Sequence, residues 1–575
     1  MVYWTKKQLR EQVSVVKGQL EPTMVLQHAT YLHGPLKRWM KGNIWIYGDR
    51  IVYVGEKMPD HMHQTEVVDV TNYFIVPGYV EPHAHPFQLY NPQSLAHYAS
   101  QGGTTTLVND NMPFFLLLPN EKALPFIEDF RRLPTSVYWW SRFDAQTELR
   151  NNEQYFQTTR VQEWMNHPDV IQGGELTAWP KVLHSNDMML HWMQEMKSLR
   201  KPIDGHLPGA SEKTLTMMEL LGVTSDHEAM TGKEAYMRAT MGLMTTLRYS
   251  SIRPDAQIVL KELQAYDLTS YESFMYTTDG SMPLFLKEGM IDAMIAMALQ
   301  ENINPIEAYN MASLYPARHF RLDDMLGIIA PGRLAHLNVL SSLQNPIPDS
   351  VIAKGVWVKR DGEDTFPSIN IDWKGMEKGV ELDFDVTMDD LHFSMPFGIR
   401  MINSVITKPY QYAIDVSTEA LSNDHDENFL VLLDRHGKWR VNTILKGFAT
   451  DVGGLCSTYS TTGDILFIGK SKKDMVKAFQ RVKEMKGGIC LIRDGEVCAE
   501  IELPLGGGMS FESVPHLITK HESFVHAIRE LGYPFEDPIY TLLFLSSTHL
   551  PYIRITPVGM YDVMKQTILF PSLMR

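Results

Sequence analysis

One stretch decides the fold: FIVPGYVEPHAHP, residues 74–86, an apolar run that ends in two histidines, His83 and His85. The run favours a buried β-strand, and side chains at positions i and i+2 of a strand point the same way. With 21 histidines in 575 residues, such a pair also arises by chance, as His61 and His63 show in the polar string PDHMHQT. The pair at His83 differs because it stands at the end of an apolar strand.

From this strand onward the chain repeats an apolar run, a turn and an amphipathic helix to about residue 320. This pattern is typical of parallel βαβ units. Eight candidate strands can be placed, and they predict an α/β fold with a TIM-like (β/α)8 barrel. The strands are FIVPGYVE, GTTTLVND, SVYWWSRF, VIQGGELT, KPIDGHLP, GVTSDHEA, LMTTLRYS and ESFMYTTDG.

Further segments flank the predicted barrel at 77–320. Residues 1–22 have the pattern of an N-terminal amphipathic helix. Short apolar alternations broken by Gly and Asp fill 23–76 and return at 321–365, so we expect one small β-sandwich domain split around the barrel. Residues 390–575 mix apolar strands with helices and predict a separate C-terminal α+β domain.

Composition excludes several classes of protein. The 53 basic and 68 acidic residues give a net charge of −15, without a strong basic patch, which argues against binding nucleic acid. The longest apolar runs, such as FFLLLP at 114–119, are far shorter than the roughly 18 residues of a membrane helix. The first 20 residues lack the apolar core of a signal peptide, and the three cysteines form no CxxC pair. We therefore predict a cytoplasmic protein that does not bind membranes.

Ligand-type side chains also end four later strands: Glu175, His206, His227 and Asp279. The carboxyl ends of barrel strands meet at one face, where the active sites of such barrels lie. Folding should therefore bring four imidazoles and two carboxylates together, and these donors without a thiolate suit one or two divalent ions of Zn, Fe or Mn. The predicted metal ligands are His83, His85, Glu175, His206, His227 and Asp279.

The chemistry follows from such a site. A bound divalent metal lowers the pKa of water from 15.7 to about 7, and Asp279, at the end of the last strand, is predicted to act as general base and acid. Glu228, next to His227, is a second candidate catalytic residue if it turns toward the substrate, and a salt-bridged or capping residue if it does not. Arg248, which closes LMTTLR, could hold an anionic or polar edge of the substrate, but a surface ion pair is the favoured expectation.

The order of these residues on an eight-stranded barrel resembles the amidohydrolase superfamily, and the flanking strings resemble its adenine deaminase family. VPGYVEPHAH is similar to the family's strand-one motif, and IDGHLPGASEKTL is similar to its DGHAPG segment. The SDHE block is matched by GVTSDHEAMTGKEAYMRATMGLMTTLR, and the closing GxIxPGRxADLxVL segment by GIIAPGRLAHLNVL. GGICLIRDGEVCAEIELPLGGGMS resembles the family's C-terminal domain.

The resemblance implies a metal-dependent hydrolase of purine metabolism that converts adenine and water to hypoxanthine and ammonia. It also implies a bridge by Glu175 between two ions. Manganese is among the expected metals, a purine-like small molecule is the expected substrate, and we expect a homo-oligomer.

Four strings depart from the family pattern. PFQL at 86–89 stands in place of IESS, and NDNMPFF at 109–115 replaces an acidic string that carries a histidine. Gly280 and Ser281 stand where TDDRHP has an Asp and an Arg. STYSTTGD at 457–464 replaces a histidine-rich AHDSHN-like string. The predicted metal residues are kept, whereas several expected substrate contacts are changed.

Two other functions remain open at this point. A cyclic-amide or N-acyl amidohydrolase would use the same metal site and release a carboxylate instead of ammonia. A barrel that binds a ligand without catalysis would be expected to have lost metal ligands, yet all six positions are filled here.

Overall fold

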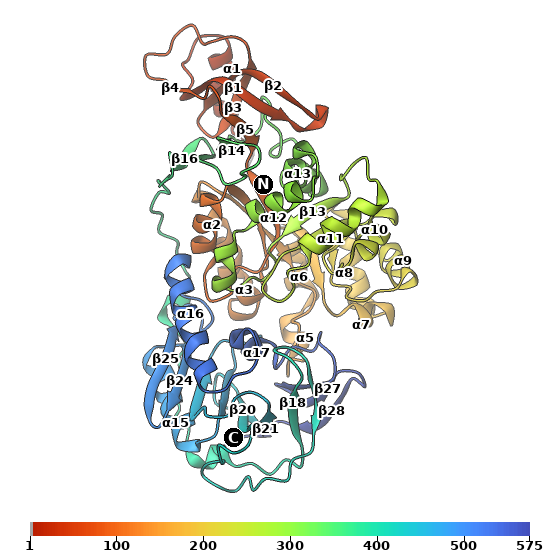
Figure 1. Cartoon of the computed structure of the whole chain (residues 1–575), viewed down its shortest axis with the longest axis vertical. Coiled ribbons are helices and arrows are strands. Elements are labelled where there is room, and N and C mark those ends of the chain that lie inside the picture. The colour runs from red at the N-terminus through yellow and green to blue at the C-terminus, as the bar shows by residue number, and fades with distance from the viewer. Residues whose placement is uncertain (1–3) are drawn as a thin grey trace.

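The computed structural model describes residues 4–575, so residues 1–3 of the predicted N-terminal helix lie outside the described residues (Figure 1). Its centre is an eight-stranded parallel sheet that curls into a nearly closed barrel, with strands β6 to β13 in sequence order, as predicted. The strands are β6 Tyr79–Ala84, β7 Thr104–Asn109, β8 Ser136–Ser141, β9 Val170–Leu176, β10 Ile203–Gly205, β11 Ser225–Asp226, β12 Met244–Arg248 and β13 Phe274–Thr277.

The seam between the first and last strands is closed by a side chain. Ala84 of β6 forms an isolated bridge with Asp279, two residues beyond the end of β13, and Glu81 of β6 is fully buried. Its carboxylate accepts hydrogen bonds from the hydroxyl of Thr277 at 2.7 Å, from the backbone N–H of Thr278 at 2.8 Å and from that of His83 at 3.0 Å. β6 and β13 are the two edge strands of the barrel sheet. The Glu81 side chain therefore supplies hydrogen bonds that a paired strand would otherwise provide.

Helices follow the strands and cover the outside of the barrel (Figure 1). Aromatic side chains pack one group of them against the strands: the rings of Phe114 and Phe130 each lie 5.5 Å from that of Trp139 on β8. The helices are α2 Pro92–Gln101, α3 Met112–Leu117, α4 Asn120–Asp129, α5 Asn152–Tyr155, α6 Thr158–Asn166, α7 Trp179–Leu183, α8 Asp187–Ser198, α9 Glu212–Leu220, α10 Gly232–Thr240, α11 Ala256–Leu263, α12 Ile291–Gln300, α13 Pro305–Met311 and α14 Leu314–His319.

A nine-stranded sheet lies at the end of the molecule that carries α1 (Lys6–Val16) (Figure 1). Some of its strands precede the barrel in the sequence and the others follow it. β5 pairs in parallel with β1 and antiparallel with β14, so the chain leaves this sheet and later returns to it. The strands are β1 Met24–His33, β2 Arg38–Tyr47, β3 Arg50–Gly55, β4 Glu66–Asp69, β5 Phe74–Pro77, β14 Leu337–Leu340, β15 Ser350–Ala353, β16 Val356–Arg360 and β17 Glu363–Asp364.

The segment predicted as the first barrel strand, 74–81, is two strands. β5 belongs to the outer sheet and β6 to the barrel, and the chain passes between them at Gly78. A Cβ atom at Gly78 would overlap the hydroxyl of Thr105 on β7, so the backbones approach too closely there for a side chain. The continuous apolar pattern concealed this change of sheet.

A second nine-stranded sheet, a three-stranded sheet and three helices form the C-terminal region (blue in Figure 1). The strands are β18 Gly398–Met401, β19 Thr407–Tyr410, β20 Glu427–Leu433, β21 Trp439–Lys446, β22 Gly454–Ser457, β23 Ile465–Gly469, β24 Gly488–Arg493, β25 Glu496–Glu502, β26 Ile553–Thr556, β27 Gly559–Asp562, β28 Thr567–Pro571 and β29 Leu573–Met574. The helices are α15 Lys472–Glu484, α16 Val514–Glu530 and α17 Pro538–Phe544.

Within residues 4–575, none of the helices combines the length and the apolar character needed to cross a bilayer. The domain boundaries expected from the sequence stay a prediction.

Removing the Glu81 carboxylate is expected to destabilise the barrel. In Glu81→Ala, the N–H groups of Thr278 and His83 lose a buried acceptor, and each unmade bond costs about 1–3 kcal/mol. We expect a loss of about 3 kcal/mol, measured as a lower midpoint of thermal unfolding by circular dichroism. Glu288→Ala removes an exposed glutamate of the same barrel and should change stability by about 0.5 kcal/mol or less. Equal midpoints for the two variants would contradict the role of Glu81.

Candidate metal centre

All six residues predicted as ligands lie together at the carboxyl end of the barrel. Three overlapping groups of side chains have ligand atoms within 4.8 Å of one another. They are His83 with His85 and Glu175, Glu175 with His206 and His227, and His83 with Asp204 and His227. The sixth predicted ligand, Asp279, has its Oδ1 atom 3.0 Å from His85 Nε2 and 3.6 Å from His83 Nε2.

Glu175 lies between two pairs of histidines. Its Oε1 atom is 2.6 Å from His206 Nδ1 and 3.3 Å from His227 Nε2, whereas its Oε2 atom is 3.8 Å from His85 Nε2. The two carboxylate oxygens thus face different imidazoles, which is the arrangement a bridging ligand requires.

His83 provides a test of whether the residues fit a metal ion. Neither of its ring nitrogens makes a hydrogen bond within residues 4–575, although both are buried. Nδ1 faces Asp204 at 3.0 Å, and the ring stacks on Trp140 with centroids 4.5 Å apart. Buried polar atoms are almost always satisfied, and an imidazole beside carboxylates is a common metal ligand. The donor set therefore fits a divalent cation.

Asp204 is a member of the cluster that the sequence interpretation missed. Its Oδ2 atom lies 3.0 Å from the Nδ1 atoms of both His83 and His227, and its Oδ1 atom accepts a 2.6 Å hydrogen bond from Ser225. The sequence did contain a pattern that points to Asp204, because this residue stands two positions before His206 at the end of a strand. The i, i+2 argument applied to the HxH pair also applies to this DxH pair.

Asp110 and Arg142 were also missed. Asp110 follows β7 and holds His85 Nδ1 at 2.8 Å, while Arg142 follows β8 and is fully buried. The Arg142 Nη2 atom lies 2.5 Å from Asp110 Oδ2 and 2.9 Å from Glu175 Oε2. Both residues directly follow a strand, where the sequence alone does not separate a buried ion pair from a solvated one.

Glu228 turns into the cluster, because β11 ends at Asp226 and the strand alternation no longer applies. Its Oε1 atom lies 3.4 Å from His206 Nδ1 and accepts a 2.6 Å hydrogen bond from Arg248. Arg248 also donates to Asp279 Oδ2 at 3.0 Å and is 4% exposed, so the expectation of a surface ion pair was wrong. Its guanidinium joins the two carboxylates predicted to be catalytic.

The charges of the cluster shift one another's titration. Burial alone would raise the pKa of Asp279, but the neighbouring His83, His85 and Arg248 hold it well below its usual range. Burial would also raise the pKa of Glu228, but the charge of Arg248 beside it lowers this pKa to about 2. Both carboxylates are therefore ionised at neutral pH.

The C-terminal region covers this end of the barrel. The hydroxyl of Tyr459 donates to the side-chain oxygen of Gln88, and that of Tyr540 donates to the carbonyl of Gly280. A Cβ atom on Gly280 would lie 2.8 Å from Gln88 Nε2, so a side chain there would require Gln88 to move. Three of the four departures from the family strings, at 86–89, at Gly280 and at 457–464, thus meet at one contact between the barrel and the C-terminal region.

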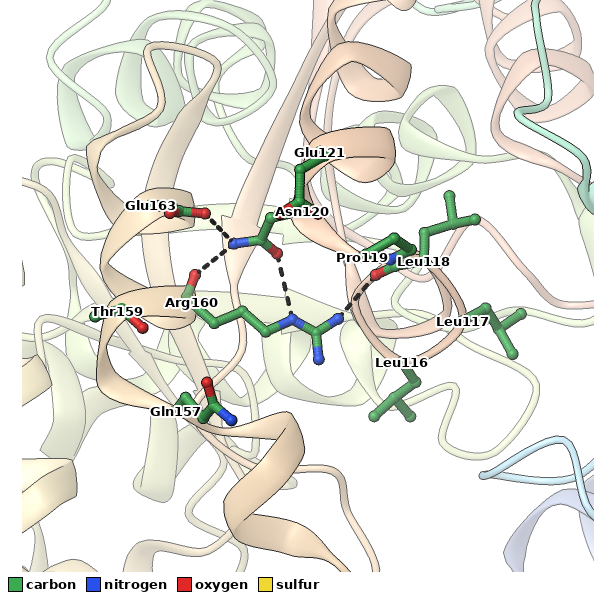
Figure 2. A pocket seen from close by; sticks show the side chains of 10 residues that line it. All are labelled: Leu116, Leu117, Leu118, Pro119, Asn120, Glu121, Gln157, Thr159, Arg160 and Glu163. Carbon is green, nitrogen blue, oxygen red and sulfur yellow. Dashed lines mark hydrogen bonds between the residues drawn. The ribbon is translucent and has the colours of Figure 1, made fainter.

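A separate cavity of about 430 Å³ lies elsewhere on the barrel and shares no residue with the cluster (Figure 2). Figure 2 shows Asn120 between Glu163 and Arg160, with its amide donating to Glu163 at 2.6 Å. Arg160 donates to Asn120 at 3.3 Å and to the carbonyls of Phe115 and Leu118. These polar groups use their hydrogen bonds on one another, so we assign this part of the cavity wall a role in stabilising the fold.

Comparisons with known proteins agree with this geometry. The amidohydrolase family matches residues 74–358, and the adenine deaminase C-terminal domain matches residues 404–567. The chain is 54% identical to the "Putative adenine deaminase" of Halalkalibacterium halodurans, with 100% of this chain and 99% of that protein covered. It is 51% identical to a protein of the same description in Bacillus subtilis, with the same coverage. "Adenine deaminase 2" of Carboxydothermus hydrogenoformans is 26% identical, with 99% of this chain and 100% of that protein covered.

The two matched domains account for the barrel and for most of the C-terminal region, and the similarity to the relatives runs from one end of the chain to the other. This protein is a member of the adenine deaminase family within the amidohydrolase superfamily.

Proposed function

We propose that the protein deaminates a purine base by hydrolysis, with adenine and water as substrates and hypoxanthine and ammonia as products. One observation supports this most directly: four imidazoles and the carboxylates of Glu175 and Asp279 converge at the catalytic end of a barrel. The names of relatives that match the whole chain point to adenine as the base.

The residues present fit one or two divalent ions of Mn, Fe or Zn. His83, His85 and Asp279 would hold one ion, His206 and His227 would hold a second, and Glu175 would stand between them. When bound, such an ion lowers the pKa of water from 15.7 to about 7 and so supplies a nucleophile at neutral pH.

Asp279 is proposed to move the protons of the reaction. Its Oδ2 atom is occupied by Arg248, whereas Oδ1 faces the imidazoles of His83 and His85. In our proposal Oδ1 accepts a proton from the attacking water and passes it to the departing nitrogen. A C–O bond forms at C6 of the purine, the C6–N bond breaks, and the nitrogen leaves as ammonia.

Glu228, which shares the Arg248 guanidinium with Asp279, is proposed to hold the substrate. Arg248 and Arg253 hold its two oxygens at 2.6 and 3.0 Å, so the carboxylate is fixed rather than free to rotate. A fixed carboxylate beside His206 can accept a hydrogen bond from a ring N–H and hold the base in one orientation.

The setting of the enzyme is part of the same proposal. We propose a cytoplasmic homo-oligomer in purine metabolism that acts on a small molecule and binds neither nucleic acid nor membranes. The net charge of −15 and the small number of cysteines support this assignment.

A direct assay tests the function. Protein loaded with Mn²⁺ is expected to release ammonia from adenine and to form equimolar hypoxanthine, and a chelator should remove both the metal and the activity. Metal content, ammonia and the ultraviolet spectrum of the base are the measurements. Full metal occupancy with no ammonia from any aminopurine would overturn the purine assignment, and a carboxylate released from a cyclic amide would favour the alternative hydrolase.

A substitution tests the proposed role of Asp279. Asp279→Asn keeps the shape of the side chain but cannot accept the proton, so kcat should fall about 10²–10⁴-fold. Because four imidazoles and Glu175 remain, we expect much of the metal to stay bound. The control is Asp267→Asn, at an exposed position of the same barrel, which should keep wild-type kcat. Near-normal turnover in Asp279→Asn would contradict the proton-transfer role.

A further inference from the structure

A cavity of about 550 Å³ lies at the junction of the barrel and the C-terminal region, beside the metal centre. Its lining includes Gln146 and Thr177 from the barrel and Thr548, His549 and Tyr561 from the C-terminal region. Substrate sites are concave, mostly apolar and supplied with a few convergent polar groups, and volumes of about 300–1,000 Å³ are usual. This cavity meets that description next to the predicted chemistry.

Two hydrogen bonds fix the C-terminal wall of the cavity. The backbone N–H of Thr548 donates to the carbonyl of Gln146 at 2.8 Å, and the hydroxyl of Thr147 donates to the carbonyl of Ser546 at 2.6 Å. These bonds hold the segment 546–549 against the loop that follows β8. The position of His549 is therefore set by contacts to the barrel itself.

His549 reaches the metal centre from the C-terminal region. Its ring lies edge-on to the ring of His206, with centroids 5.3 Å apart. The Nδ1 atom is buried and has no hydrogen-bond partner within residues 4–575. His549 belongs to none of the groups whose ligand atoms could hold an ion. The residue as a whole is only half-buried and lines the cavity, so its imidazole can meet a ligand there.

Gln146 joins the barrel side of the same cavity to the cluster. Its Nε2 atom donates to Glu175 Oε2 at 3.1 Å. Gln146 also adopts a left-handed backbone conformation, with φ of 59°. Residues other than glycine in this region are uncommon and concentrate at functional sites.

Part of the remaining wall is aromatic, and the rest includes methionines and charged side chains such as Glu148 and Lys181. Phe143, Phe156 and Trp192 line the cavity and pack on one another, with the centroids of Phe143 and Trp192 5.9 Å apart. Trp179, at the start of α7, lines it as well. Aromatic walls with a polar end suit a flat heteroaromatic ring, because ring stacking adds to the burial of its faces.

We propose that this cavity binds the purine ring and that His549 and Gln146 hydrogen-bond its edge, so that the C-terminal region supplies part of the specificity. The inference rests on the proposed function and deepens it. Purine nitrogens offer acceptors and donors along one edge, and an imidazole and a carboxamide can each provide the matching group. His549 makes no contact with the reacting atoms, so it is proposed to determine binding rather than chemistry, whereas Gln146 also holds Glu175.

The test compares KM, kcat and product binding in full-length, Mn²⁺-loaded protein. His549→Ala should raise KM for adenine about tenfold and weaken hypoxanthine binding by a similar factor, as expected for the loss of one hydrogen bond. The value of kcat and the metal content should change little. Hypoxanthine binding can be followed by tryptophan fluorescence, since Trp179 and Trp192 line the cavity. His549→Asn should restore part of the affinity, which a purely packing role would not predict.

The control is His526→Ala on α16, whose side chain is 77% exposed, and it should leave both constants at their wild-type values. Gln146→Ala provides a second variant on the barrel side, with the same expected rise in KM, if His549→Ala folds poorly. Deamination by the wild type with unchanged KM and hypoxanthine affinity in the His549 and Gln146 variants would overturn this inference and leave the proposed function intact. A wild type that holds metal but neither binds nor deaminates purines would overturn both.

Discussion

Charge balance at the carboxyl end of the barrel is the constraint on which the structure of the site depends. Five carboxylates in or beside the candidate metal centre are buried: Asp110, Glu175, Asp204, Glu228 and Asp279. Burying ionised carboxylates without partners is prohibitively costly. Guanidinium groups and imidazoles from other strands face each of them, which holds the strand ends in register. Glu175 and Asp279 each face two imidazoles, and these are the carboxylates proposed to bind metal.

Much of this arrangement could be predicted from local pattern. Strand alternation and the rule that barrel strands end at one face were enough to bring His83, Glu175 and Asp279 together. The same rules could have found Asp204, because it stands two residues before His206. Arg142 and the burial of Arg248 were not accessible in this way, since a strand-end arginine has the same local pattern whether it pairs with a buried carboxylate or with solvent. The break at Gly78 was hidden because both strands beside it are apolar.

The position of His549 could not be predicted from the sequence for a different reason. More than 300 residues separate it from His206, and nothing in the string SSTHLPYIRI marks it as part of a barrel site. Only the docking of the C-terminal region brings the two rings together.

The departures from the family strings are also explained by contacts between segments that are distant in the sequence. Gln88, Gly280 and Tyr459 lie far apart in sequence but form one contact. Asp110, within the altered string at 109–115, orients His85.

The central claim is that side chains from five strands surround a divalent ion. Crystals of the full-length protein grown with Mn²⁺, measured near the manganese absorption edge, test it most directly. The account predicts an anomalous difference peak, or two, between Glu175 and the imidazoles of His83, His85, His206 and His227. Ordered manganese bound elsewhere on the protein, with these imidazoles still bonded to carboxylates alone, would contradict it.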